Sequence, residues 1–192
     1  MSRTLRNALA AVPLTLFFAA CTDAAKAPAE AAMQAAASAV DSLKGDAAKF
    51  APESVKAVEA SYAQAKALMA KEDYKGALAA AGEIPGKAKQ ALADAAAKKD
   101  ELVKAWSDLQ ASLPNMVAAL KSRIGILSQA KKLPAGLDKA ALEKAKAGLA
   151  SIESGWDKAT AQFKGGDLSG AVSAAKDLKT KAADLMKSIG LQ

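Results

Sequence analysis

The sequence predicts an all-α protein: an elongated antiparallel helical bundle of five to six helices with two related helical hairpins. Three observations predict this fold class. Alanine, the strongest helix former, supplies 52 of the 192 residues. Apolar residues recur every seven positions through several stretches, which is the spacing of a seam between packed helices. No stretch sustains the alternation of apolar and polar residues that is typical of a strand.

Two helices are expected in the first third of the chain. Pro28 suits the first turn of a helix, and Gly45 suits the position just after its end. Pro52 starts the second helix, and Asp73 can cap the helix that follows it. The apolar stripe of the second helix recurs every seven residues, at Val55, Tyr62 and Met69.

A long third helix is expected from Tyr74 to about Ser112. Pro85 should kink it, because the proline ring excludes the hydrogen bond to the carbonyl four residues earlier. Pro114 is expected to start a separate fourth helix, which ends before the turn at residues 133–136.

The last two helices are expected to form the second hairpin. Asp138 can cap the fifth helix and Asp167 the sixth, with Gly165 and Gly166 between them. The fifth helix carries its own stripe with a period of seven, at Leu142, Leu149, Trp156 and Phe163.

The start of the chain has the pattern of an export signal. Arg3 and Arg6 precede an apolar run at residues 8–20. This run is too short to cross a bilayer, which needs roughly 20 residues, and it fits the apolar region of a secretory signal. Cys21, the one cysteine of the chain, follows directly and has no intrachain disulfide partner.

The run ends in Phe18-Ala19-Ala20-Cys21, which resembles the lipobox of bacterial lipoproteins. The family usually has an aliphatic residue where Phe18 stands. The resemblance implies that Cys21 is acylated and becomes the new N-terminus, which makes Cys21 the one predicted site residue. Two alternatives are ordinary secretion with cleavage near residues 25–27 and an uncleaved signal anchor.

The resemblance also implies a location in the bacterial cell envelope. Thr22 follows the cysteine where an aspartate would favour retention in the inner membrane, so we expect an outer-membrane lipoprotein that faces the periplasm. Asp23 leaves the choice between the two membranes open. The expected partners are the membrane, through the lipid on Cys21, and a protein or cell-wall component.

An internal repeat joins the two hairpins. An offset of 94 residues places the turn Asp73-x-x-Gly-Ala on Asp167-x-x-Gly-Ala and aligns the aromatic stripes before it. The turn resembles that of tetratricopeptide repeats, although the period is far longer, and the resemblance implies a tight helical hairpin. The opening Phe50-Ala-Pro-Glu is also similar to uncharacterised alanine-rich lipoproteins of Gram-negative bacteria.

The amino-acid composition argues against most kinds of catalytic and metal-binding site. The chain has no histidine, so it lacks the commonest general base and metal ligand, and acylation would remove the one thiol. We therefore expect no catalytic, metal or cofactor-binding residue and no cofactor. The mature part from Cys21 onward carries 25 basic and 20 acidic residues. Arg123 is its one arginine, so nucleic acid is not an expected partner.

These observations lead to a function hypothesis: a non-enzymatic, membrane-anchored envelope lipoprotein that acts as a helical scaffold or adaptor. The alternative is a periplasmic module that holds a small or lipidic molecule between the hairpins. An enzyme that uses carboxylates or lysine is a third, weaker hypothesis. The large aromatic residues on the stripes are expected in the core, and Arg123 in a surface salt bridge.

The expected organisation of the chain follows. It comprises a signal peptide at 1–20, a lipidated N-terminus, tether and alanine-rich helix at 21–49, a first hairpin at 50–113, a connecting helix at 114–133 and a second hairpin at 134–192.

Overall fold

The computed structural model describes residues 24–191, which form helices and no strand. This confirms the all-α prediction. In chain order the helices are α1 (Lys26–Asp41), α2 (Asp46–Phe50), α3 (Pro52–Ala70), α4 (Tyr74–Gln129), α5 (Lys139–Lys164) and α6 (Leu168–Ser188).

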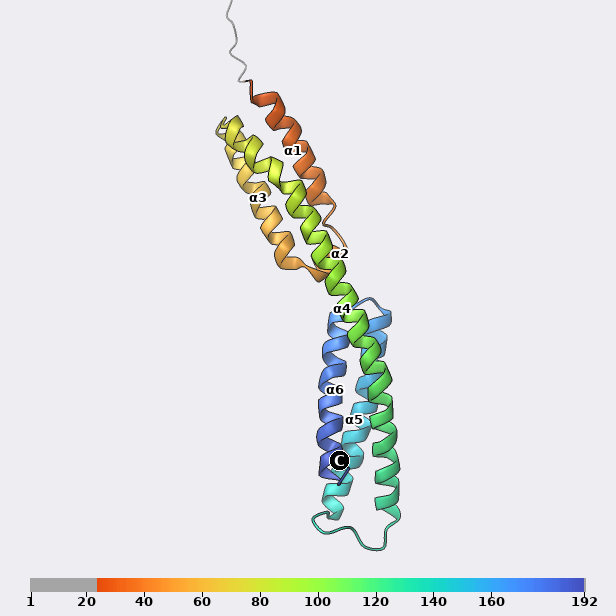
Figure 1. The fold of residues 1–192 in the computed structure, drawn as a ribbon. Coiled ribbons are helices and arrows are strands. Elements are labelled where there is room, and N and C mark those ends of the chain that lie inside the picture. The colour runs from red at the N-terminus through yellow and green to blue at the C-terminus, as the bar shows by residue number, and fades with distance from the viewer. Residues whose placement is uncertain (1–23, 192) are drawn as a thin grey trace, which may run out of the picture.

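The helices form two three-helix bundles joined end to end through α4 (Figure 1). The first bundle contains α1, α3 and the first half of α4, and the second contains the second half of α4, α5 and α6. The start of α1 lies at one end of the molecule, and the loop at residues 130–138 lies at the opposite end, which we call the distal end. At 1.5 Å per residue, the 56 residues of α4 extend roughly 84 Å along the rod.

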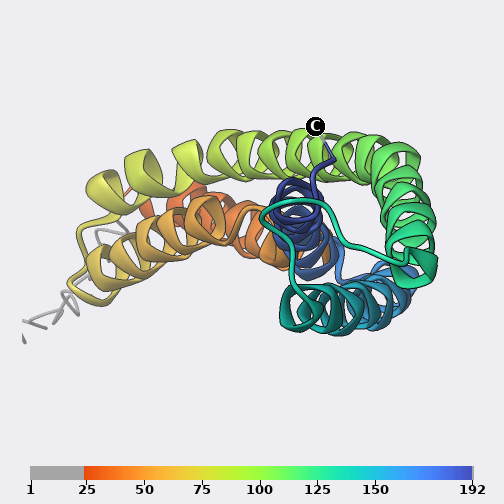
Figure 2. The ribbon, with the colours of Figure 1, turned by 90° about the horizontal axis from the view of Figure 1, so that it is seen from below.

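Helix α4 runs unbroken through both of its prolines, Pro85 and Pro114. The prediction of a separate helix starting at Pro114 is therefore wrong, and α4 instead curves along its length (Figure 2). Leu113 and Leu120, both 0% exposed, lie seven residues apart on the same seam on either side of the proline. Burial of this seam offsets the one backbone hydrogen bond that the ring removes.

The short helix α2 was not predicted from the sequence. It follows Gly45, whose φ of 100° is a conformation that residues with a side chain rarely adopt. The chain turns there, and Leu43 and Ala47 on either side of the turn are both buried against the first bundle. Helix α2 thus lies at the lower end of the first bundle, beside α4.

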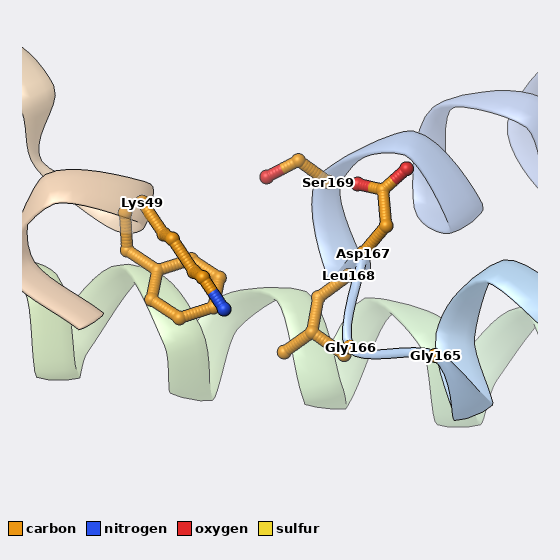
Figure 3. A pocket seen from close by; sticks show the side chains of 7 residues that line it. Lys49, Gly165, Gly166, Asp167, Leu168 and Ser169 are labelled. Atoms are coloured by element: carbon orange, nitrogen blue, oxygen red, sulfur yellow. The ribbon is translucent and has the colours of Figure 1, made fainter. Parts of the chain in front are cut away.

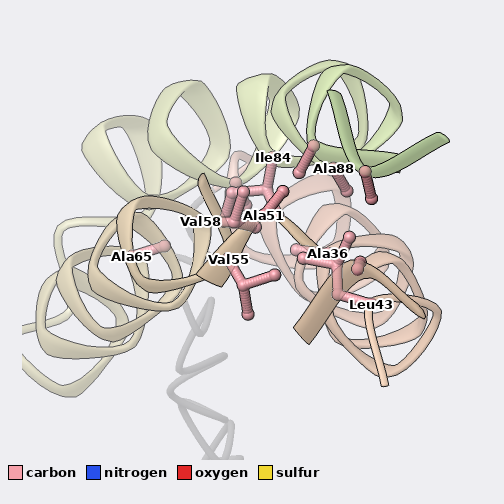
Figure 4. Packing of buried hydrophobic residues seen from close by; sticks show 12 residues of the cluster. Ala36, Leu43, Ala51, Val55, Val58, Ala65, Ile84 and Ala88 are labelled. Atoms are coloured by element: carbon pink, nitrogen blue, oxygen red, sulfur yellow. The ribbon is translucent and has the colours of Figure 1, made fainter. Parts of the chain in front are cut away.

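The core of the first bundle is thin. Of the twelve buried residues in its cluster, eight are alanine, and the larger side chains include Leu43, Val58 and Ile84 (Figure 4). The cluster at the distal half of the second bundle has eleven buried residues, of which nine are leucine or isoleucine. Because leucine buries more apolar area than alanine, the second bundle has the stronger hydrophobic driving force for folding.

No helix among residues 24–191 is both long and apolar enough to cross a bilayer.

Candidate functional site

The joint between the two bundles is the first candidate site, and a single helix crosses it. The buried positions of α4 in the first bundle end at Ala95, and those in the second begin at Leu102. All six residues at 96–101 are exposed. The two bundles are therefore connected by less than two turns of helix that pack no side chain into a core.

Helix α2 braces this crossing. The Lys99 ammonium donates a hydrogen bond of 2.8 Å to the Asp46 carboxylate, which joins α2 to the exposed part of α4. This bond holds the pKa of Asp46 below its ordinary value and raises that of Lys99. The same ammonium lies 5.9 Å from the centre of the Phe50 ring.

Phe50 is the one side chain of α2 that reaches both bundles. It packs partly buried against the alanine-rich cluster of the first bundle. It also packs against the cluster at the near end of the second bundle, which contains Leu102, Trp106 and Leu168. Phe50 thus extends hydrophobic contact across the joint that α4 alone crosses.

An aromatic stack closes the near end of the second bundle. Trp106 of α4, 5% exposed, stacks on Trp156 of α5 with ring centres 5.0 Å apart. It also stacks on Phe163 of α5 at 4.5 Å, and both pairs are close to parallel. These rings pack on one another in the core, as the sequence predicted, and Tyr62 packs partly buried in the first bundle.

A hollow of about 360 Å³ lies at the joint, between α2 and the turn that connects α5 to α6. Lys49 lies on one side, and Asp167, Leu168 and Ser169 lie on the other (Figure 3). The Asp167 carboxylate already accepts a hydrogen bond of 2.9 Å from the Gly170 amide. The polar side chains left to meet a ligand are one ammonium and one hydroxyl.

The two hairpin turns have the same geometry at the predicted offset of 94 residues. Asp73 accepts from the Gly76 amide at 2.9 Å, as Asp167 does from the Gly170 amide. The amide of each aspartate also donates a hydrogen bond of 3.0 Å to a carbonyl five residues earlier. Both aspartates therefore cap the helix that follows them, as predicted.

The residue before each capping aspartate adopts a positive φ. It is Gly166 in the second turn, with φ of 87°, and Glu72 in the first, with φ of 60°. A residue with a side chain is strained in this conformation, so the first turn folds at a higher local cost than the second.

Two glycines let α5 and α6 approach closely. A Cβ atom on Gly155 would lie 2.6 Å from Leu178, and one on Gly148 would lie 3.3 Å from Leu185. Two open grooves of about 440 and 560 Å³ follow this seam. Their walls share Lys181 and are otherwise mostly small, polar or charged residues.

The other predicted residues have different outcomes. Cys21 lies outside the described residues, so its acylation stays a prediction. Arg123 forms no ion pair within residues 24–191, and the predicted salt bridge is absent there. Its Nε instead donates a hydrogen bond of 3.1 Å to the Ile189 carbonyl, where it satisfies an acceptor at the end of α6.

The described part of the chain buries no charged or polar residue, and no three potential metal ligands gather in it. Comparison with protein-family models, curated proteins and solved structures finds no match for this chain.

The joint could not be found from sequence patterns. Phe50 is a lone aromatic residue ahead of Pro52, and the sequence presents it only as part of a helix start. Its contact with both bundles depends on how α2 packs beside residues 96–101 of α4, which no local sequence pattern indicates.

Proposed function

We propose that this protein is a lipid-anchored helical spacer of the bacterial cell envelope that carries a contact surface away from the membrane and catalyses no reaction. Its anchor is an acylated Cys21, and its partner is a protein or cell-wall component. The observation that carries the proposal is the pairing of a lipobox-like sequence with a rod whose first helix starts at one end.

The distance between anchor and rod supports this proposal. Lys26, the first residue of α1, lies five residues after Cys21. The Lys26 ammonium lies 5.8 Å from the centre of the Tyr74 ring, so the starts of α1 and α4 are neighbours. A lipid on Cys21 would hold this end at the bilayer, and α4 would extend the molecule away from it.

The repeated architecture also supports a spacer. We infer that the hairpins α3–α4 and α5–α6 arose by duplication, because their turns share cap, hydrogen bonds and positive φ. Each hairpin is completed by a preceding helix, α1 in one bundle and the end of α4 in the other. Helix α4 is both the last helix of the first bundle and the first helix of the second. Two units that share a helix in this way form a longer rod with no flexible linker between them.

The anchor is tested by mass spectrometry of the N-terminal peptide and by membrane fractionation of the chain expressed in a Gram-negative host. We expect the wild-type protein to begin at Cys21 with an added acyl mass and to sediment with membranes. Cys21→Ala should lose both the acyl mass and the membrane association.

The matched control is Thr22→Ala, which changes the neighbouring residue and should keep the acyl mass. Thr22→Asp should move the protein from the outer to the inner membrane fraction if sorting follows the residue after the cysteine. A wild-type protein that begins elsewhere, carries no acyl chain and stays in the soluble fraction would overturn the proposal.

A second candidate function is the binding of a small or lipidic molecule between the hairpins. The hollow beside Phe50 favours it, because it lies where the two bundles meet and presents an aromatic ring, an ammonium and a hydroxyl. Native mass spectrometry of the protein released gently from membranes should then retain a bound molecule. Phe50→Ala should lose that molecule, whereas Tyr62→Ala, in the first bundle, should keep it.

A further inference from the structure

The charge of the rod is concentrated at one end. Residues 24–120 and 147–180 together contain equal numbers of cationic and acidic side chains, 16 of each. Residues 121–146 and 181–191 contain nine cationic and three acidic side chains. These two segments form the distal end, where α4 ends, α5 begins and α6 ends (Figure 1). The full net charge of the described residues, +6, therefore lies at the end opposite the start of α1.

In both parts of the rod, most cationic side chains form no ion pair with another described residue. Five lysines of the first bundle and its joint lie within 3.1 Å of a carboxylate oxygen. At the distal end Lys121 pairs with Glu153 and Lys146 with Glu143. Among residues 24–191, six lysines there form no ion pair; we call them the distal lysines: Lys131, Lys132, Lys139, Lys144, Lys181 and Lys187. All six are exposed.

Two of the three acidic groups at this end are already engaged. Asp138 accepts a hydrogen bond of 2.7 Å from the Ala141 amide as the cap of α5. Glu143 accepts one of 2.8 Å from Lys146. Asp184, on the wall of a groove between α5 and α6, is the third. The distal lysines thus present their charge to solvent with little internal compensation.

The residue types at this end indicate what kind of anion they meet. Arginine is favoured where a discrete carboxylate or phosphate is gripped by two hydrogen bonds, and the one arginine here, Arg123, is used to hold the end of α6. Lysine is a point charge on a long, flexible apolar stem, which suits an extended anionic surface. Ile126 of α4, at the same end of the rod, is 60% exposed, whereas Leu133 and Leu137 of the loop are half-buried and pack against the core of the second bundle.

Exposed aliphatic side chains among lysines are typical of segments that rest on the surface of a bilayer. No aromatic residue among residues 24–191 lies at the distal end to stack on a sugar ring. We infer that the distal end binds the surface of a bilayer that contains anionic phospholipid. A second step rests on the proposed function, in which an acylated Cys21 anchors the other end of the rod in a membrane. The rod would then hold two bilayers apart by roughly the length of α4.

The test uses the full chain purified in detergent from host membranes and reconstituted into vesicles of phosphatidylcholine. These vesicles are loaded with sucrose so that they sediment, and they are mixed with sucrose-free fluorescent vesicles of phosphatidylcholine with or without phosphatidylglycerol. The fluorescence that sediments with the protein-bearing vesicles is the captured fraction. We expect capture of the anionic vesicles alone, and loss of capture at high salt, which screens exposed charges. Each lysine near an anionic surface raises partition about fivefold, so Lys131→Glu, Lys132→Glu and Lys139→Glu together should lower capture by about a hundredfold or more.

The matched control reverses three exposed lysines of the first bundle that also form no ion pair among the described residues: Lys71→Glu, Lys75→Glu and Lys89→Glu. It changes the net charge equally and should keep capture. Circular dichroism and the melting temperature check that both triple variants are folded.

The two proposals fail separately in this experiment. If the protein does not incorporate into the neutral vesicles, the proposed lipid anchor is contradicted. The distal-end inference can then still be tested by flotation of the protein with anionic vesicles, which compares the binding of the wild type with that of the distal triple variant. Equal capture of neutral and anionic vesicles, or equal capture by both triple variants, would overturn the distal-end inference. Binding to purified cell-wall sacculi without capture of anionic vesicles would assign the surface to a cell-wall polymer instead.

Discussion

Removal of the Trp106 ring is expected to destabilise the second bundle strongly. Trp106 is 5% exposed and lies between α4 and α5, where it stacks on both Trp156 and Phe163. Trp106→Ala leaves a cavity in a cluster that also contains Leu168 and receives Phe50 from α2. The substitution therefore tests the packing that closes the second bundle at the joint.

The magnitude follows from the burial of the ring. A buried tryptophan removes about 150–250 Å² from water, which at about 25 cal/mol per Å² corresponds to roughly 4–6 kcal/mol. Measured losses for Trp→Ala in protein cores are about 3–5 kcal/mol, cavity included. We expect the free energy of unfolding of the second bundle, at residues 102–191, to fall by about 4 kcal/mol and its melting temperature by about 16–32 °C.

Urea unfolding followed by fluorescence measures this loss, because Trp156 is then the one remaining tryptophan and reports on the second bundle. Val103→Ala is the matched control: it lies on the same helix, is 45% exposed, and should change stability by less than about 0.5 kcal/mol. A loss for Trp106→Ala below about 1.5 kcal/mol, or one equal to that of the control, would show that the ring is not packed as described.

Three further predictions concern α4 and its brace. Pro114→Ala should raise the free energy of unfolding by about 1–2 kcal/mol, because it restores a backbone donor inside a continuous helix; urea unfolding measures it. Replacing Ala96 and Ala97 together by glycine should weaken the unpacked crossing by about 2 kcal/mol and broaden the range of molecular lengths in small-angle scattering. The hydrogen bond from Lys99 lowers the pKa of Asp46, so the small contribution of this exposed pair to the docking of α2 should be fully present above the ordinary pKa of 3.8. It should be lost as the pH falls through the lowered pKa, which amide exchange in α2 measures as a modest rise in rate.

Each of these has a contrary result. A destabilised Pro114→Ala variant would mean that the proline sets a bend that the bundle needs. An unchanged length distribution in the double glycine variant would mean that α2 alone holds the joint rigid. Acid-dependent exchange that persists in Asp46→Asn would assign the pH dependence to another carboxylate.

Those parts of the fold that depend on local chemistry could be predicted from the sequence. The capping aspartates at 73, 138 and 167 each accept a hydrogen bond from an amide three residues later, as expected for short acidic side chains at helix starts. The seven-residue stripes of α3 and α5 face the core. Caps and stripes act over one or two turns, so a short window of sequence contains the information they need.

Features that depend on distant contacts could not be predicted. A proline inside a helix costs about 3 kcal/mol, and the sequence at Pro114 contains no local compensation. The compensation is the seam that Leu113 and Leu120 share with α5 and α6, which exists only after the chain folds. The role of Arg123 was missed for the same reason, because its acceptor at Ile189 is 66 residues away.

The candidate sites also differ in whether local sequence or distant contacts define them. The acylation of Cys21 is a prediction from a contiguous motif and stays one. The joint lies inside a stretch that the sequence predicted as one helix, and no motif marks residues 96–101 as the place where the core is interrupted. The charged distal end lies between these cases, because its lysines are visible in the sequence but come together only when the ends of α4 and α6 meet the start of α5.

The mechanical behaviour of the rod follows from where its core is interrupted. Within each bundle a bend of α4 would expose buried leucine, isoleucine or alanine, and the packed neighbours oppose it. At residues 96–101 nothing is buried, so the helix resists bending there only through its backbone hydrogen bonds, one lysine–glutamate pair at Lys98 and the brace of α2. The brace is itself a five-residue helix held by the buried Ala47, by Phe50 and by one ion pair. Any bending of the rod should therefore concentrate at the joint.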